Sequence, residues 1–115
     1  MPVIHTHAST NISKEQREAL KTAYGKAITA VPGKSEGWLM CPFEDNMPIY
    51  FGGDDGKPAA YVEVNVFGSD VPRASWEELT RQIDAALEDV LGIPSNRVYI
   101  RYTATTDWGW SGRNF

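Results

Sequence analysis

The sequence has one cysteine, two histidines and no long hydrophobic run. Cys41 has no partner in the chain, which excludes an intrachain disulfide framework and a cysteine-rich zinc site and is typical of a reducing compartment. No basic segment followed by an apolar stretch marks a signal peptide, and no apolar run is long enough to span a bilayer. We therefore expect a cytoplasmic protein that would be released, if at all, without a signal peptide.

Positive charge is also scarce. Eleven Lys and Arg residues against 15 Asp and Glu residues give a formal net charge of -4, and the basic residues are scattered along the chain. Neither nucleic acid nor a membrane surface is therefore an expected partner. With 115 residues and 42% hydrophobic content, we expect one domain, residues 1–115, whose small core would gain from oligomerisation.

The chain carries the same pattern twice, in about residues 1–57 and 58–115. Each half contains a predicted amphipathic helix, because apolar residues recur at the i, i+3, i+4, i+7 spacing over residues 13–33 and 75–92. Each half is therefore predicted to run strand, helix, strand. The four strand-like runs cover residues 2–8, 37–43, 59–67 and 97–103.

Both predicted helices have start and stop signals. Their first turns match the capping box, in which two side chains bond the free backbone N–H groups of the helix start. A glycine then ends each helix, at Gly33 after a proline and at Gly92. The two capping pairs are Ser13 with Gln16 and Ser75 with Glu78.

Two strand–helix–strand units predict a particular α+β fold. Two strands joined through a helix within one sheet lie parallel with a right-handed crossover, so two units can form a four-stranded mixed sheet with both helices on one face. The other face is then bare, and an apolar bare face favours association with another copy of the chain. The large residues expected on it are Val3, Trp38, Met40, Tyr61 and Tyr102.

Several short motifs occur in an order that is typical of one family. Met1-Pro2 starts the first strand, Gly33-Lys34 follows the first helix, "YFGG" ends at Gly53, and "NRVYIRY" precedes "WGWSGRNF" at the carboxyl terminus. Over essentially its whole length the chain resembles the tautomerase superfamily, and within it the macrophage migration inhibitory factor and D-dopachrome tautomerase group. The resemblance implies a homotrimer with an active site at each subunit interface. It also implies cofactor-free keto-enol tautomerisation of a phenylpyruvate, hydroxyphenylpyruvate or dopachrome type of substrate.

The resemblance makes Pro2 the candidate general base. Removal of Met1 would leave Pro2 with a secondary amine. An ordinary α-amine has a pKa of about 7.7–8.0, and an apolar pocket or neighbouring cations lower this pKa. Pro58 begins the second half in the same way, but its nitrogen stays an amide. The alternative is that Pro2 only starts a strand, where a proline is tolerated.

Two cationic residues and a tyrosine are candidate substrate ligands. Lys34 matches a family lysine near the mouth of the pocket; the alternative is a solvated lysine after a helix end. Arg101 resembles the arginine of the D-dopachrome tautomerase branch and could bind a carboxylate through two parallel hydrogen bonds, unless it forms a surface salt bridge. Tyr99 lies two residues earlier on the same strand, so both side chains point to one face.

Five aromatic residues are expected to shape the substrate slot, as the resemblance implies. Phe67 stands where the family has an isoleucine and Trp108 where it has a valine, so both should narrow the slot. Each aromatic residue taken alone is equally compatible with core packing. The five are Trp38, Phe67, Trp108, Trp110 and Phe115.

Three other features of the sequence do not indicate a functional site. His5 and His7 share one strand face, a spacing compatible with metal binding, but no third ligand is apparent, so we expect no metal. The run "FGGDDGK" lacks the spacing of a phosphate-binding loop and is predicted to be a turn. The Cys-x-x-Cys motif of the cytokine is replaced at Ala59 and Val62, so its thiol chemistry does not carry over.

Two alternative functions stay open. One is a released cytokine mimic that binds a host receptor and keeps residual catalysis. The other is a different superfamily reaction, namely hydration, dehalogenation or decarboxylation. Such a reaction needs a side chain that activates water, and Glu63 and Tyr99 are the candidates.

Overall fold

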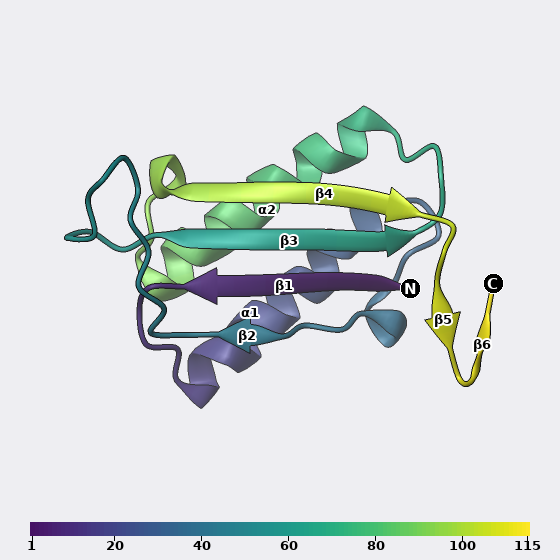
Figure 1. Ribbon diagram of the computed structural model, residues 1–115, viewed down its shortest axis with the longest axis horizontal. Helices are drawn as coiled ribbons and strands as arrows, with labels where there is room; N and C mark the ends of the chain where they lie inside the picture. Colours follow the sequence, from purple (N-terminus) through teal and green to yellow (C-terminus); the bar gives the residue numbers. More distant parts are fainter.

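The computed structural model describes residues 1–115, and two helices lie across one face of a four-stranded mixed sheet (Figure 1). The strands are β1 (Pro2–Ala8), β2 (Phe43–Glu44), β3 (Ala60–Phe67), β4 (Val98–Thr105), β5 (Gly109–Trp110) and β6 (Arg113–Asn114). The α-helices are α1 (Lys14–Ala27) and α2 (Arg73–Leu91), and the short 3-10 helices are η1 (Ile28–Ala30), η2 (Glu36–Trp38) and η3 (Ser95–Arg97).

The sheet topology confirms the predicted α+β class. The strand order is β2-β1-β3-β4; β1 is parallel to β2 and β3 to β4, whereas β1 and β3 are antiparallel. Each helix therefore connects two parallel strands, and the two β-α-β units join through the β1–β3 pair. A separate hairpin of β5 and β6 lies beyond the start of β1 (Figure 1).

The second predicted strand, residues 37–43, is only partly formed. Residues 36–38 make the 3-10 helix η2, Met40 forms a single bridge to Val3, and the regular strand is limited to Phe43 and Glu44. Alternate carbonyls still bond to β1, since Ile4 N–H donates to Met40 O at 2.9 Å and Thr6 N–H to Pro42 O at 3.1 Å. Pro42 has no N–H to donate, which is typical of a sheet edge.

The helix starts follow the prediction in one case only. Ser13 and Gln16 form the predicted capping box of α1, with both side-chain-to-backbone bonds present. The predicted Ser75–Glu78 box of α2 is wrong. This helix begins at Arg73 after Pro72, so Ser75 lies inside its first turn, and the Glu78 side chain bonds forward to Arg81 and Gln82. Pro72 is the N-cap residue, and its carbonyl accepts from Ser75 N–H at 2.9 Å, so Ser75 already belongs to the helix.

The core lies between the sheet and the two helices. Alternate residues of β1 and β3 face the helices and are buried, as the period of two in a strand requires. One buried polar contact crosses this core: Thr6 Oγ1 and Tyr24 Oη are 2.8 Å apart, and both residues have 0% exposure. The core side chains include Ile4, Leu20, Tyr24, Ile28, Val62, Val64, Leu79, Ile83 and Leu87.

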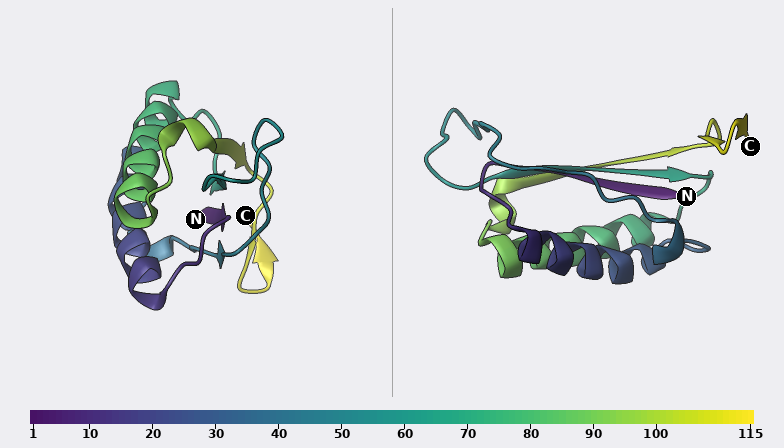
Figure 2. Two further views of the ribbon diagram at one scale, coloured as in Figure 1. Left: turned by 90° about the vertical axis from the view of Figure 1, so that its left-hand side faces the viewer. Right: turned by 90° about the horizontal axis from the view of Figure 1, so that it is seen from below.

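No helix covers the other face of the sheet (Figure 2). Tyr99 and Arg101 of β4 point to this open face and are exposed. Tyr102 was predicted on the open face, but this prediction is wrong: its ring stacks on Trp76 of α2 with 4.7 Å between centroids, and its hydroxyl bonds Thr80 at 2.6 Å. Because strand side chains alternate, Tyr102 and Arg101 must point to opposite faces.

The glycine-rich loop before β3 is a turn, as predicted. Phe51 and Asp54 bridge each other across Gly52 and Gly53, whose φ angles of 59° and 82° are in the left-handed region that glycine favours. The buried Arg97 side chain holds this loop by donating to the carbonyls of Asp54, Lys57 and Pro58 at 2.9–3.0 Å. Neither α-helix has the length and apolar character that a membrane span needs.

Candidate active site

Pro2 begins β1 at one end of the sheet and is buried on the side of the helices (Figure 1). Two backbone bonds fix this position: Met1 O accepts from Phe67 N–H, and Pro2 O accepts from Met40 N–H, both at 3.0 Å. While Met1 is attached, the Pro2 nitrogen is an amide without a basic lone pair. The position is therefore rigid, and its chemistry depends on removal of Met1.

Lys34 lies beside the start of β1, in the loop after η1. Its Nζ donates to the Phe67 carbonyl at 2.5 Å and lies 5.7 Å from the centroid of the Phe67 ring. Partial burial lowers the pKa of the Met1 amine, and the positive charge of Lys34 lowers it further. An amine at this end of the sheet is thus in surroundings that favour its neutral, basic form.

The aromatic residues of the carboxyl terminus join Lys34 and Phe67 in one cluster. The Phe115 ring lies 5.6 Å from that of Phe67 and 6.3 Å from that of Trp110, measured between centroids. Trp38 meets Trp110 edge to face at 5.2 Å. The cluster is half exposed, with Trp38, Trp110 and Phe115 at 52%, 47% and 49%. Trp108 joins it through the backbone, because its carbonyl accepts from Phe115 N–H at 3.0 Å.

A small pocket opens next to this cluster. It has a volume of about 220 Å³, and Lys34 and Phe67 line one side of it. Val31 and Pro32 after η1 and the loop from β3 to α2 form the remainder of its wall. The structure therefore brings together Pro2, Lys34, Phe67, Trp38, Trp110 and Phe115 at one end of the sheet.

Tyr99 and Arg101 are not part of this group within one chain. Pro2 is in register with Val66 of β3, and Val66 is in register with Ala104 of β4. Tyr99 lies five residues before Ala104 on β4, so it is far from Pro2 along the strands. Tyr99 packs instead against Phe51, with ring centroids 5.1 Å apart. Arg101 lies opposite Glu63 on the open face. The predicted site residues thus form two groups on one protomer.

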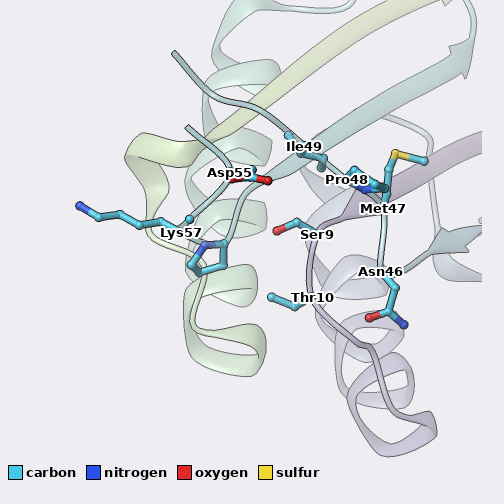
Figure 3. Close-up of a pocket in the computed structure, with 10 residues that line it drawn as sticks. Ser9, Thr10, Asn46, Met47, Pro48, Ile49, Asp55 and Lys57 are labelled. Carbon is cyan, nitrogen blue, oxygen red and sulfur yellow. The ribbon is translucent and has the colours of Figure 1, made fainter. Parts of the chain in front are cut away.

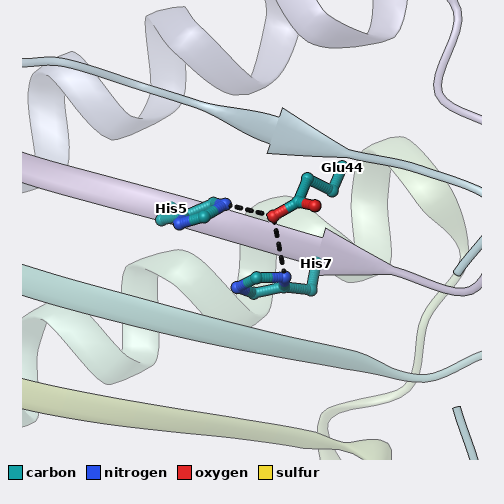
Figure 4. Close-up of side chains that lie close together, drawn as sticks. All are labelled: His5, His7 and Glu44. Carbon is teal, nitrogen blue, oxygen red and sulfur yellow. Dashed lines mark hydrogen bonds and ion pairs between the residues drawn. The ribbon is translucent and has the colours of Figure 1, made fainter.

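His5 and His7 share one face of β1, as predicted. The expectation that no third metal ligand lies near them is wrong. Glu44 of β2 lies beside both rings (Figure 4), and a single oxygen, Oε2, is 2.7 Å from His5 Nε2 and 3.2 Å from His7 Nδ1. Glu44 is 39 residues from His5 in the sequence. Only the pairing of β1 with β2 brings it there, and no sequence motif marks it.

A larger pocket, of about 390 Å³, lies at the opposite end of the sheet from Pro2 (Figure 3). It is open to solvent and is lined by both polar and apolar groups, and none of the predicted site residues line it. The loops after β1 and before β3 form its wall. Its lining includes Ser9, Thr10, Asn46, Met47, Asp55 and Lys57.

Comparisons with known proteins agree with one class of fold. The structure of MIF2 from Leishmania major superposes with a TM-score of 0.92 and 36% identity, covering 100% of this chain and 97% of that one. The macrophage migration inhibitory factor of Toxoplasma gondii gives 0.85 and 24%, covering 98% and 99% of the two chains. A homologue from Prochlorococcus marinus gives 0.79 and 26%, with 98% of each chain covered. These likenesses define the fold as that of the tautomerase superfamily.

Sequence similarity narrows the class to a family. The macrophage migration inhibitory factor homolog of Trichuris trichiura is 31% identical over 114 residues, which cover 93% of this chain and 95% of that protein. No model of a known protein family matches the chain. The chain belongs to the macrophage migration inhibitory factor family of the tautomerase superfamily.

Proposed function

We propose that the chain is a cofactor-independent keto-enol tautomerase that acts on a small aromatic α-keto acid, with the amine of Pro2 as general base once Met1 is removed. The grouping of Lys34 with the aromatic cluster around the start of β1 carries this proposal. That end of the sheet combines a position for an amine, a cation for an anionic substrate and apolar rings for an aromatic side chain.

The surroundings of the chain start suit a base that works near neutral pH. Burial and Lys34 both lower the pKa of the Met1 amine, and the Pro2 nitrogen lies one residue closer to the core. A Pro2 amine should therefore have a pKa below that of an ordinary α-amine, which favours its neutral form. A neutral amine can accept a proton from carbon.

The proposed reaction moves one proton and adds or removes no other atom. Pro2 takes the proton from the carbon next to the ketone, the electron pair of the C–H bond becomes the C=C bond of the enolate, and the π pair of the carbonyl moves to its oxygen. The protonated Pro2 amine then gives its proton to that oxygen, which forms the enol and restores the neutral amine; the reverse reaction uses the same two transfers. Lys34 would stabilise the negative charge of the substrate.

The active unit in this proposal is a homotrimer with shared sites. The open sheet face and the aromatic cluster leave large residues exposed, with Met40 at 64% and Tyr99 at 66%, which is typical of an interface between subunits. Since Tyr99 and Arg101 lie away from Pro2 in one chain, a neighbouring subunit would have to supply them to the site. Arg101 would then bind the substrate carboxylate.

Phenylpyruvate tautomerisation tests the function directly. Wild type, Pro2→Gly and Pro58→Gly are compared after intact-mass analysis has confirmed that Met1 is absent. Pro58 is the matched control, because it precedes β3 as Pro2 begins β1 but is always an amide. We expect Pro2→Gly to lose kcat/KM by about 100-fold or more, and Pro58→Gly to keep it. Equal activity of Pro2→Gly and wild type would refute the proposal.

A further inference from the structure

Four side chains that can bind metals converge on the open face of the sheet, away from Pro2. His5 and His7 alternate on β1, Glu44 of β2 is in register with His7, and Glu63 of β3 is in register with His5. Three adjacent strands thus hold the four groups on one rigid surface. Strands position ligands more precisely than loops do.

The distances between these groups are short. Glu44 Oε2 lies 2.7 Å from His5 Nε2 and 3.2 Å from His7 Nδ1 (Figure 4). On the other side, Glu63 Oε1 lies 3.0 Å from His7 Nε2 and 4.0 Å from His5 Nδ1. The two imidazole rings are 4.1 Å apart between centroids. Each histidine is therefore enclosed by carboxylate oxygens from both neighbouring strands.

Both ring nitrogens of His7 face carboxylate oxygens. A neutral imidazole has a single N–H, yet both ring nitrogens of His7 have a carboxylate oxygen within hydrogen-bond distance. An ionised carboxylate only accepts, so one of the two contacts needs either an extra proton or a metal ion. Arg101 of β4 is in register with Glu63 of β3, but the two side chains form no ion pair.

The three ligand atoms lie close to the spacing of a zinc-type site. One ligand atom each from His5, His7 and Glu44 lie within 4.8 Å of one another. Zinc binds nitrogen and oxygen at about 2.0–2.2 Å, which places neighbouring tetrahedral ligands roughly 3.3–3.6 Å apart. Metal binding would lengthen the 2.7 Å contact between Glu44 Oε2 and His5 Nε2 by about 0.6–0.9 Å, and the half-exposed Glu44 side chain can move outward to allow this.

Glu63 contacts the ring nitrogen of His7 that does not face Glu44. A histidine that binds a metal through one nitrogen usually donates its other N–H to a carboxylate, which fixes the ring and raises its basicity. Glu63 occupies this place, since its Oε1 faces His7 Nε2 while His7 Nδ1 faces Glu44. Glu63 is therefore expected to orient His7 and not to bind the ion itself.

We propose that His5 Nε2, His7 Nδ1 and the Glu44 carboxylate bind a divalent transition-metal ion of the zinc class, with Glu63 as the positioning residue of His7. The fourth coordination position is left for a water molecule or another ligand. All three ligands come from one chain, so the site does not depend on the proposed tautomerase activity or on the trimer. Calcium and magnesium prefer oxygen ligands and should not bind.

Calorimetric titration of zinc chloride into the chelator-treated full chain tests this site. We expect wild type to bind one zinc ion per chain, and His7→Gln and Glu44→Gln to lose this stoichiometric binding. Glu63→Gln should bind zinc about 10–100-fold more weakly than wild type does. Glu77→Gln, at an exposed glutamate of α2, and Cys41→Ser are the matched controls and should bind as wild type does. Thermal unfolding of each variant without metal confirms that it is folded, and Glu44→Gln is the safest because its side chain is half exposed.

Cobalt(II) absorption identifies the ligands independently. The chain has two histidines, so a four-coordinate nitrogen and oxygen spectrum without a thiolate band that is lost in His7→Gln comes from this cluster. Absence of zinc binding to wild type would overturn the proposal. Wild-type affinity in His7→Gln and Glu44→Gln, or equally tight binding of calcium, would also overturn it.

Discussion

Mixing two inactive variants tests whether the proposed site is shared between subunits. Tyr99 lies five residues along the sheet from the level of Pro2 and two strands away. At about 3.3 Å per residue and 4.8 Å per strand, the backbone positions are roughly 17 Å apart along the strands and 10 Å across them. Arg101 is three residues along, on the opposite sheet face from the Pro2 side chain. One chain therefore cannot complete the site.

The expected recovery follows from the symmetry of a trimer. Pro2→Gly and Arg101→Ala are each inactive or nearly so when assembled alone. In randomly mixed trimers a site is intact when the first chain has Pro2 and the next has Arg101, and each condition holds for half of the chains. About one quarter of wild-type activity per site should return in an equal mixture.

The assay is phenylpyruvate tautomerisation after the two variants are denatured and refolded together, with native mass spectrometry to confirm mixed trimers. Each variant refolded alone is the control. Activity no greater than the average of the two variants, in the presence of mixed trimers, would show that each chain carries a complete site.

Three further predictions follow from individual contacts. Lys34→Met removes the cation near the amino terminus, so the pKa of the mature Pro2 amine should rise. The acid limb of the pH profile of kcat/KM should then move to higher pH, and an acid limb that does not move would contradict this effect of Lys34. Tyr24→Phe leaves the buried Thr6 hydroxyl without its partner, which should lower the free energy of unfolding by about 1–3 kcal/mol in urea, and adding Thr6→Val should recover most of the loss. Burial raises the pKa of Tyr24, so the unfolded chain releases this proton first and stability should fall as pH rises above about 10. Tyr24→Phe should weaken that fall, and an equal fall in both proteins would exclude Tyr24 as its cause.

The architecture was largely predictable because local patterns agree with it. The helical spacing around Leu20 and Leu79, and the alternation in β1 and β3, identify the layers and the buried faces without any long-range information. The start of α2 was not predictable from Ser75 and Glu78, because Pro72 offers a competing start. The side chain of Tyr102 follows from strict alternation with Arg101.

The candidate site was predictable in part. Lys34, Phe67 and the aromatic cluster come together as expected, since loops at one end of a sheet meet. The separation of Arg101 from Pro2 depends on the strand register, which the residue types alone do not set. Glu44 was missed for the same reason: its approach to His5 and His7 exists only through the parallel pairing of β1 and β2.

The proposed catalysis depends on a neutral, basic nitrogen at Pro2. Nitrogen-15 NMR of proline-labelled protein, purified without any added tag at its start, measures the titration of this atom directly. We predict one proline nitrogen that titrates below the usual range of an α-amine, at the same pH as the acid limb of kcat/KM for phenylpyruvate. A Pro2 nitrogen that is an amide, or that stays protonated throughout the pH range of activity, would show that Pro2 is not the base.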